Sequence, residues 1–397
     1  MQVKTKYSRN FKLSIAGEKI NNISSSMMLV LFPWIVLTLT NSPFLAGVEL
    51  SISNVPLAFS FLVGHYLTKV KSKKALEVGV TGIRALVLLF IFLVFLTGNE
   101  FYELVSIFIG FFITSWTEDV SSQIGGYWDK EFLDENQYQR GFSLSTTLST
   151  IINLISYILA GTFIAIGIDL AFPILIMGFA IATVIRSFIK PKSDGFIEDQ
   201  PHNFKEGFSY IWKNNVLRYL MLQALSTSLA VGGFLILIES LVKYRYGSSP
   251  FILTGILVGA MVGGVVGASL SGRIKGNPRT IMGIAVFFYI PLILFIPFSP
   301  SYIFIIVDGF VITVLNQIHG VTFNNIFFKS VTKDHMLQVR GAHSSLALFP
   351  AVISSLIIGS IIEFVSIDSA FYFIAALTLV TLYFTWKAKE IGKMRID

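Results

Sequence analysis

Long apolar stretches, each about the length of a membrane-crossing helix, alternate with short polar segments along the whole chain. A helix that crosses a bilayer needs roughly 20 mostly apolar residues. Alternation of polar and apolar residues over about ten positions, typical of outer-membrane strands, is absent. Twelve stretches meet the requirement for a helix, namely 13–38, 43–67, 75–97, 102–125, 142–166, 169–189, 217–242, 250–272, 280–298, 302–327, 341–364 and 369–386. The pattern therefore predicts an all-α membrane protein with twelve transmembrane helices.

The amino-acid composition excludes a water-soluble fold. Of the 397 residues, 54% are hydrophobic and 13% are charged, against roughly 25% charged residues in an average soluble domain. So few charges could not cover the surface of a soluble fold, whereas a surface that faces lipid needs none. The chain has no cysteine, which excludes disulfides and thiolate chemistry.

The basic residues are concentrated in alternate loops between the predicted helices. A formal net charge of +7 could suggest nucleic acid as a partner, but most of the 30 Lys and Arg residues lie in the two tails and in every second loop. Only Lys243 and Arg245 fall in a loop of the opposite set. Cytoplasmic loops carry the excess of basic residues, so we expect both termini in the cytoplasm, a multi-pass position in the cell membrane, and no nucleic-acid partner.

A polar segment divides the predicted helices into two sets of six. It begins at Lys190-Pro191-Lys192, where the proline and the turn residues after it end a helix. Later in the segment, Phe208, Ile211 and Trp212 have the spacing of an amphipathic helix on the inner membrane surface. We therefore expect a first half over 1–189, a linker over 190–216, and a second half with its tail over 217–397.

Short motifs along the chain carry a family resemblance. They are Phe32-Pro33-Trp34 with Leu39-Thr40 and Ser42, the loop 64–74, Gly82–Leu86, the segment 205–218, and Gln338–Gly341. Together they resemble the macrolide-efflux and enterobactin-exporter branch of the major facilitator superfamily, over essentially the whole chain. The chain departs from this pattern at Thr68, where the family usually has Asp, and in the fifth predicted helix, which keeps only Gly161 of a Gly-Pro signature.

The resemblance implies a fold and a function. The fold would be that of major facilitator transporters, with two parallel six-helix repeats that expose a midplane cavity to one side at a time. The function would be proton-coupled efflux of a small amphipathic compound by a monomer without a cofactor. An uptake carrier or a siderophore exporter stays open, and more remotely a lipid enzyme or a sensor. Walker and G-x-S-x-G motifs are absent and the histidines lack ligand spacing, so neither an enzyme nor a metal site is expected.

Polar residues in the first predicted helix form one stripe. A charge at the centre of a membrane helix costs about 2.5–3.5 kcal/mol, so its default interpretation is functional. Glu18 is in register with Asn21, Asn22 and Ser25. We expect this stripe to face the central cavity, with Glu18 as a proton carrier. The alternative is that Glu18 and Lys19 extend to the inner membrane interface.

Two acids in the fourth predicted helix are candidates for an inner gate. Adjacent Glu118 and Asp119 point about 100° apart, so they cannot share one proton. One of them could pair with Arg84 or Arg140, in a charge network at the inner mouth that includes the loop glycine Gly64. Proton coupling by these acids is the alternative. A further stripe in the fifth helix is expected to line the substrate cavity and consists of Thr146, Thr150, Asn153 and Tyr157.

The tenth predicted helix has the strongest candidates for proton coupling. Asp308 and His319 are eleven residues apart, which returns to nearly the same face about 16 Å along the axis. Histidine titrates near neutral pH, so the two could be protonated in stages, with Asn316 between them in the substrate cavity. The alternative is a His319 hydrogen-bonded to a neighbouring helix.

The remaining intramembrane features have structural interpretations. Glu239 and Lys243 are expected to form an ordinary i,i+4 pair, and Glu49 is expected to be solvated near the outer end of its helix. In the eighth predicted helix a row of small residues indicates a close helix contact. Its glycines are Gly255, Gly259, Gly263 and Gly267.

Overall fold

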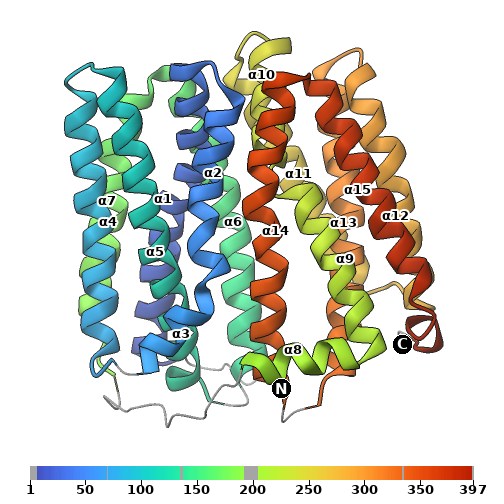
Figure 1. Ribbon diagram of the computed structural model, residues 1–397. Helices are drawn as coiled ribbons and strands as arrows, with labels where there is room; N and C mark the ends of the chain where they lie inside the picture. Colours follow the sequence, from blue (N-terminus) through green and yellow to red (C-terminus); the bar gives the residue numbers. More distant parts are fainter. Residues whose placement is uncertain (1–6, 69, 135–136, 192–203, 333–334, 396–397) are drawn as a thin grey trace. The chain divides into compact units, whose positions relative to one another are not determined.

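The computed structural model describes residues 7–68, 70–134, 137–191, 204–332 and 335–395, and within these ranges it has no β-strand (Figure 1). The helices are α1 (Arg9–Thr40), α2 (Pro43–Ala58), α3 (Ser60–Thr68), α4 (Lys73–Phe95), α5 (Glu100–Phe132), α6 (Tyr138–Ile166), α7 (Ala171–Ser187), α8 (Phe204–Lys213), α9 (Asn215–Val231), α10 (Phe234–Arg245), α11 (Pro250–Ser271), α12 (Pro278–Phe295), α13 (Tyr302–Ser330), α14 (Met336–Phe364) and α15 (Ile367–Lys387). Short 3₁₀ turns are η2 (Ile168–Leu170), η3 (Ile296–Phe298) and η5 (Ile391–Lys393).

The predicted fold class is confirmed. By length and composition, 11 segments of the described chain can cross a membrane. The second predicted span is not among them, because it is divided into α2 and α3, of 16 and 9 residues. The protein is thus an all-α, multi-pass membrane protein, while the cytoplasmic placement of both termini stays a prediction.

Two predicted spans are interrupted, each for a local reason. Pro56 lies three residues before the break at Phe59, and a proline inside a helix removes a backbone hydrogen bond. The seventh span breaks at Gly232 and Gly233, between α9 and α10. A β-carbon at Gly232 would lie 2.6 Å from the Ala351 backbone of α14. Glycine here allows the chain to approach α14 closely, and the helix is interrupted where it does so.

The helices pack into two compact units, and each unit combines segments that are not contiguous in the chain. One unit comprises residues 1–35 and 59–200, and the other comprises 36–58 and 201–397. The segment that ends α1 and forms α2 therefore packs with the second unit. In that unit α2 lies beside α14 (Figure 1). The predicted boundaries at 189 and 216 describe the order of the chain and stay a prediction.

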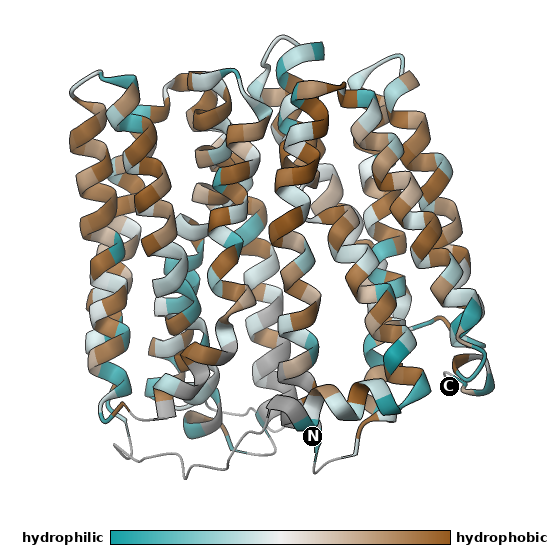
Figure 2. Ribbon diagram, in the orientation of Figure 1, coloured by the Kyte–Doolittle hydropathy of each residue, from teal (hydrophilic) through white to brown (hydrophobic). Residues whose placement is uncertain are grey.

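Charges are buried and apolar side chains are exposed, the reverse of a soluble protein. In α4, Arg84 is 0% exposed while Leu86 is 66% and Phe90 is 59% exposed. Figure 2 shows hydrophobic residues over most of α12 and α15, with hydrophilic positions gathered toward the end that leads to the C-terminus. Apolar outer surfaces fit a lipid solvent, and the buried charges must find partners inside the bundle.

Glycines set the closest helix contact in the second unit. The row predicted from the sequence faces α13: a β-carbon at Gly263 would lie 2.3 Å from the carbonyl oxygen of Phe310, and one at Gly267 would lie 2.4 Å from that of Val314. Thr313 of α13 donates a 2.6 Å hydrogen bond to the carbonyl of Ala260. The two backbones can approach this closely because no side chain separates them.

The short helix α8 lies across one end of the second unit, crosswise to α9 and α14 (Figure 1). Ile211 is buried against Leu217 and Val339, and Phe208 packs against the same cluster. Trp212 on the same helix is exposed. The amphipathic helix expected in the linker is therefore present, with one face on the bundle.

Candidate transport site

A cavity of about 280 Å³ lies within the first unit. Its lining is polar and includes Glu18, Asn21 and Asn22 of the stripe predicted on α1, but not Ser25. The lining residues are Ser14, Glu18, Asn21, Asn22, Glu77, Glu118, Ser121, Ser122, Gly125, Gly126, Asp129, Ser145 and Arg186. Helices α1, α4, α5, α6 and α7 each contribute at least one of them, so this cavity exists only when the unit is folded.

Arg84 and Glu118 form an ion pair beside this cavity. The Arg84 guanidinium is buried and also donates to Asn21 Oδ1 and, from Nε, to Thr117 Oγ1 at 3.1 Å. Glu118 accepts from Asn21 Nδ2 at 3.2 Å and from Ser25 Oγ at 2.9 Å. Of the two partners considered for the acids of α5, Arg84 is thus the one found on Glu118. Its role as an inner gate stays a prediction.

A second ion pair lies deeper in the same unit and was not anticipated. Glu77 of α4 pairs with Arg186 of α7 at 3.2 Å, and both side chains are 3% exposed. Trp128 donates its indole N–H to Glu77 at 2.6 Å, and Arg186 donates to Ser121 at 2.7 Å. In the sequence Arg186 looks like one of the basic residues around the linker, and nothing local distinguishes it from them. A partner three helices further along the chain could be found only by folding.

Lys19 is buried rather than extended to the interface. Its ammonium contacts Glu18 at 2.6 Å and donates to Ser145 and Ser149 of α6 at 2.9 and 2.7 Å. The lysine side chain is 7% exposed and that of Glu18 is 36% exposed. The interpretation of Lys19 as an interfacial residue is therefore wrong, because α6 supplies hydroxyl acceptors at the right depth. Glu18 lies on the cavity wall, with its charge opposed by Lys19.

Asp129 is the cavity carboxylate without a compensating charge. Glu18, Glu77 and Glu118 each have a basic partner, whereas Asp129 forms no ion pair with any residue the structure describes. Among the described residues, the acidic groups that line the cavity therefore outnumber their ion-paired basic partners by one. This residue was not singled out in the sequence, where it lies in a mixed polar segment at the end of a span.

Asp119 has a separate environment from its neighbour Glu118. It accepts from Ser60 Oγ at 2.7 Å and from Gln123 Nε2 at 3.2 Å. Gln123 also donates to Ser60, which joins the start of α3 to α5. Because adjacent side chains on a helix point about 100° apart, Glu118 contacts α1 and α4 whereas Asp119 contacts α3. The side chain of Arg140 and any contacts of Gly64 lie outside the described residues.

The polar stripe of α6 is partly joined to α1. Ser26 donates to Asn153 Oδ1 at 2.8 Å, and Tyr157 is half-buried one turn further on. Thr150 is half-buried as well, while the side chain of Thr146 lies outside the described residues. These residues are not among those that line the cavity of the first unit, so their contact with a substrate stays a prediction.

The two candidates for proton coupling in α13 are both buried. Asp308 is 8% and His319 is 7% exposed. The Oδ2 atom of Asp308 and the Nε2 atom of His319 have no hydrogen-bond partner in the described chain. His319 lies against the Phe323 ring, with 6.3 Å between ring centroids. Asn316, placed with them in the sequence, is exposed.

The structure contradicts what the sequence predicted for Glu239 and Glu49. Lys243 donates to the carbonyl of Leu37 and to Asn41 Oδ1, not to Glu239. Both carboxyl groups are 0% exposed, and none of their four oxygens has a partner among the described residues. The expected i,i+4 pair and the expected solvation are both wrong, because the packing of the second unit encloses these side chains.

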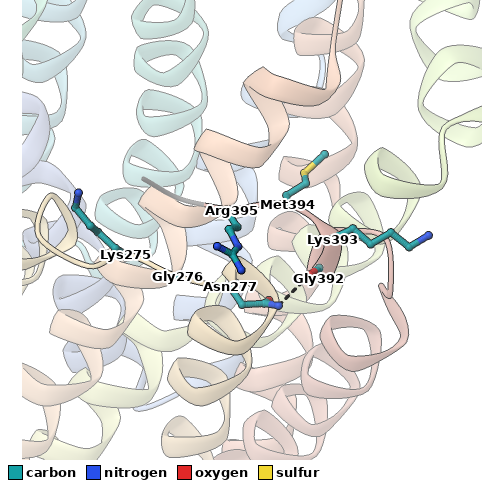
Figure 3. A pocket seen from close by; sticks show the side chains of 7 residues that line it. All are labelled: Lys275, Gly276, Asn277, Gly392, Lys393, Met394 and Arg395. Carbon is teal, nitrogen blue, oxygen red and sulfur yellow. Dashed lines mark hydrogen bonds between the residues drawn. The ribbon is translucent and has the colours of Figure 1, made fainter.

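A wider pocket of about 680 Å³ lies near the C-terminus, in the second unit. Figure 3 shows Lys275, Lys393 and Arg395 around it, with the Asn277 amide donating to the Gly392 carbonyl at 2.9 Å. No acidic residue is among the described residues that line it. Its basic lining fits the positive loops expected on the cytoplasmic face.

Known proteins resemble this chain in fold and in family. No curated protein sequence matches it. Among solved structures, the nucleoside transporter NupG matches with a TM-score of 0.76 and 13% identity, over 96% of this chain and 100% of that chain. A bacterial homologue of the iron transporter ferroportin, in an inward-facing state, matches with a TM-score of 0.73 and 11% identity, over 96% and 98% of the two chains.

A third match is the human organic anion transporter MFSD10, with a TM-score of 0.60 and 10% identity over 95% of this chain and 99% of that one. At these identities the matches show the fold alone. The family is shown by the Major Facilitator Superfamily model, which matches residues 20–349. The chain therefore belongs to the major facilitator superfamily, and it is a transporter rather than an enzyme.

Proposed function

We propose that the protein is a proton-coupled exporter in the cell membrane, and that its solute is a small amphipathic compound with a positive charge. The observation that carries the charge preference is Asp129, a carboxylate of the cavity in the first unit that forms no ion pair with a described residue. A buried or half-buried carboxylate attracts a cation more strongly than it would in water. The amide and hydroxyl groups of Asn21, Asn22 and Ser122 add hydrogen-bonding partners for the polar end of the solute.

Proton coupling is assigned to Asp308, His319 and Glu18. Two of these, Asp308 and His319, combine deep burial with a polar atom that lacks a partner. Such a group exchanges a proton with water only when the bundle opens toward it, which is what coupling requires. Glu18 lies on the cavity wall, where a solute that enters the cavity would contact it. In alternating access the cavity opens to one side of the membrane in one state and to the other side in the second state, so solute and proton can move in opposite directions.

Proton flux in proteoliposomes tests this proposal. The protein is reconstituted, a pH gradient is imposed, and an internal pH dye is followed as lipophilic cations, macrolides and catecholate siderophores are added in turn. We expect a lipophilic cation to dissipate the gradient. Asp308→Asn and His319→Ala should abolish proton flux while solute binding survives, and Asp129→Asn should weaken binding of cations selectively.

A matched control is Glu390→Gln, which removes an exposed acid that pairs with Lys393. It should leave flux unchanged. Solute movement without proton flux would contradict the coupling and indicate a uniporter. Movement of catecholate siderophores alone would contradict the cation preference and favour the siderophore exporter. Inward accumulation of the solute would favour an uptake carrier.

A further inference from the structure

Two carboxyl groups of the second unit are enclosed together without any partner. Glu49 lies in α2 and Glu239 in α10, two helices that pack against each other. Each side chain is 0% exposed, and all four carboxyl oxygens lack a hydrogen-bond partner in the described chain. The two groups are close enough that their charges would repel each other if both were ionised. The function proposed above uses neither of them.

Small residues allow close contact between α14 and the two helices that carry this pair. A β-carbon at Gly47, two residues before Glu49, would lie 2.4 Å from the carbonyl oxygen of Ser355 in α14. One at Gly233 would lie 2.9 Å from Ile358. Ser51 donates to the Val352 carbonyl at 2.7 Å. Helix α14 is therefore held closely against both α2 and the start of α10.

The charged groups on the surrounding helices are engaged elsewhere. Lys243 binds the end of α1, and Arg245 pairs with Asp368 of α15. Glu363 of α14 accepts from the backbone N–H of Phe44 at 2.9 Å and from Ser42. Helix α11, which also packs against α10, contains no charged residue. No described cation therefore neutralises Glu49 or Glu239.

An ionised carboxylate without a partner is very costly in such a place, and a buried acid usually avoids the cost by taking up a proton. We propose that Glu49 and Glu239 form a proton-binding site, occupied while α2 packs against α10 and α14, and that loss of these protons releases α2 from the second unit. The ligand is the proton itself. The link to transport rests on the proposed function, but proton binding can be measured without a solute.

Infrared spectroscopy tests proton occupancy directly. Protein in lipid nanodiscs is titrated from acid to alkaline pH, and the carbonyl-stretch band of protonated carboxylic acids is recorded. We expect a band that persists at neutral pH, that is reduced in Glu49→Gln and in Glu239→Gln, and that falls further in the double variant. The control Glu363→Gln removes an exposed, hydrogen-bonded acid and should leave the band unchanged. An unchanged band in the double variant would overturn the proposal.

Release of α2 is measured in the same preparation. Because the chain has no cysteine, Ser53→Cys introduces a single thiol one turn from Glu49 on the buried face of α2. Its alkylation rate is divided by the rate in denatured protein at each pH, which removes the thiol's own titration. We expect faster labelling at alkaline pH, and loss of this rise when Glu49→Gln and Glu239→Gln are added, because glutamine stays neutral.

The outcomes separate this site from the proposed function. If no solute drives proton flux but the band and the labelling respond as expected, the proton site stands and the efflux proposal fails. If flux is normal and the double variant changes neither the band nor the labelling, the site is wrong and the efflux proposal stands.

Discussion

Arg84 of α4 and Glu118 of α5 form an ion pair, and Asn21 of α1 binds both partners. Three helices of the first unit are thus joined through one arginine that is itself fully buried. Since the side chain of Glu118 is 36% exposed toward the cavity, the pair connects the packed interior to the space that a solute could enter.

Loss of one partner of this pair should cost more than loss of both. Arg84→Gln leaves Glu118 charged, and Glu118→Gln leaves a buried guanidinium, so we expect each to lower the free energy of unfolding by about 2–3 kcal/mol. Breaking a fully buried pair costs about 3–5 kcal/mol, and the exposure of Glu118 reduces this. A double-mutant cycle of unfolding in detergent measures the coupling. Strictly additive effects would show that the two residues act independently.

Breaking the pair of Glu77 and Arg186 should lower the free energy of unfolding more than breaking the pair of Arg84 and Glu118. Both side chains are nearly inaccessible, so Glu77→Gln should lower the free energy of unfolding by about 3–5 kcal/mol. Trp128→Phe removes the hydrogen bond to Glu77, which should cost about 1–3 kcal/mol, and the smaller ring at this fully buried position should add a packing loss. The exposed pair of Lys393 and Glu390 is the control, and Glu390→Gln should change stability by less than about 1 kcal/mol. Equal losses of stability in Glu77→Gln and Glu390→Gln would show that burial does not determine the contribution of an ion pair here.

Helix α11 should tolerate a methyl group beside its glycine row but not at Gly263 or Gly267 within it. Gly263→Ala and Gly267→Ala place a β-carbon against backbone oxygens of α13, so we expect losses of about 1–3 kcal/mol. Gly264→Ala is the matched control on the same helix, since its β-carbon would lie 3.7 Å from the nearest atom, on Gln317. It should be neutral or stabilising. Thermal unfolding in detergent compares the three, and a destabilised Gly264→Ala would show that helix propensity does not apply here.

Filling the cavity of the first unit should reduce solute binding without unfolding the protein. A β-carbon at Gly126 meets no atom within 4 Å, and the residue lines the cavity. Gly126→Leu should therefore weaken binding of the lipophilic cation that is active in proteoliposomes. Gly79→Leu, also at an open position but away from the cavity, is the control for added bulk. Unchanged binding in Gly126→Leu would mean that the solute does not enter this cavity.

Local sequence predicted the elements of the fold well. The apolar lengths located the spans, and the spacing of Phe208 and Ile211 predicted α8. The row that includes Gly263 and Gly267 predicted a close contact, which the structure places against α13. Each of these depends on properties of neighbouring residues in one helix, namely hydrophobicity, periodicity and the absence of a side chain.

Only the tertiary structure decided which polar residues meet. Glu77 and Arg84 lie on one helix, yet their partners are Arg186 and Glu118 on two different helices. From the sequence, Glu49 and Glu239 were expected to be ordinary charges near helix ends. In the structure, the packing of α14 encloses both. A sequence determines which charges enter the membrane. Their partners, their burial and therefore their protonation depend on helix packing, because these are properties of distances between elements far apart in the chain.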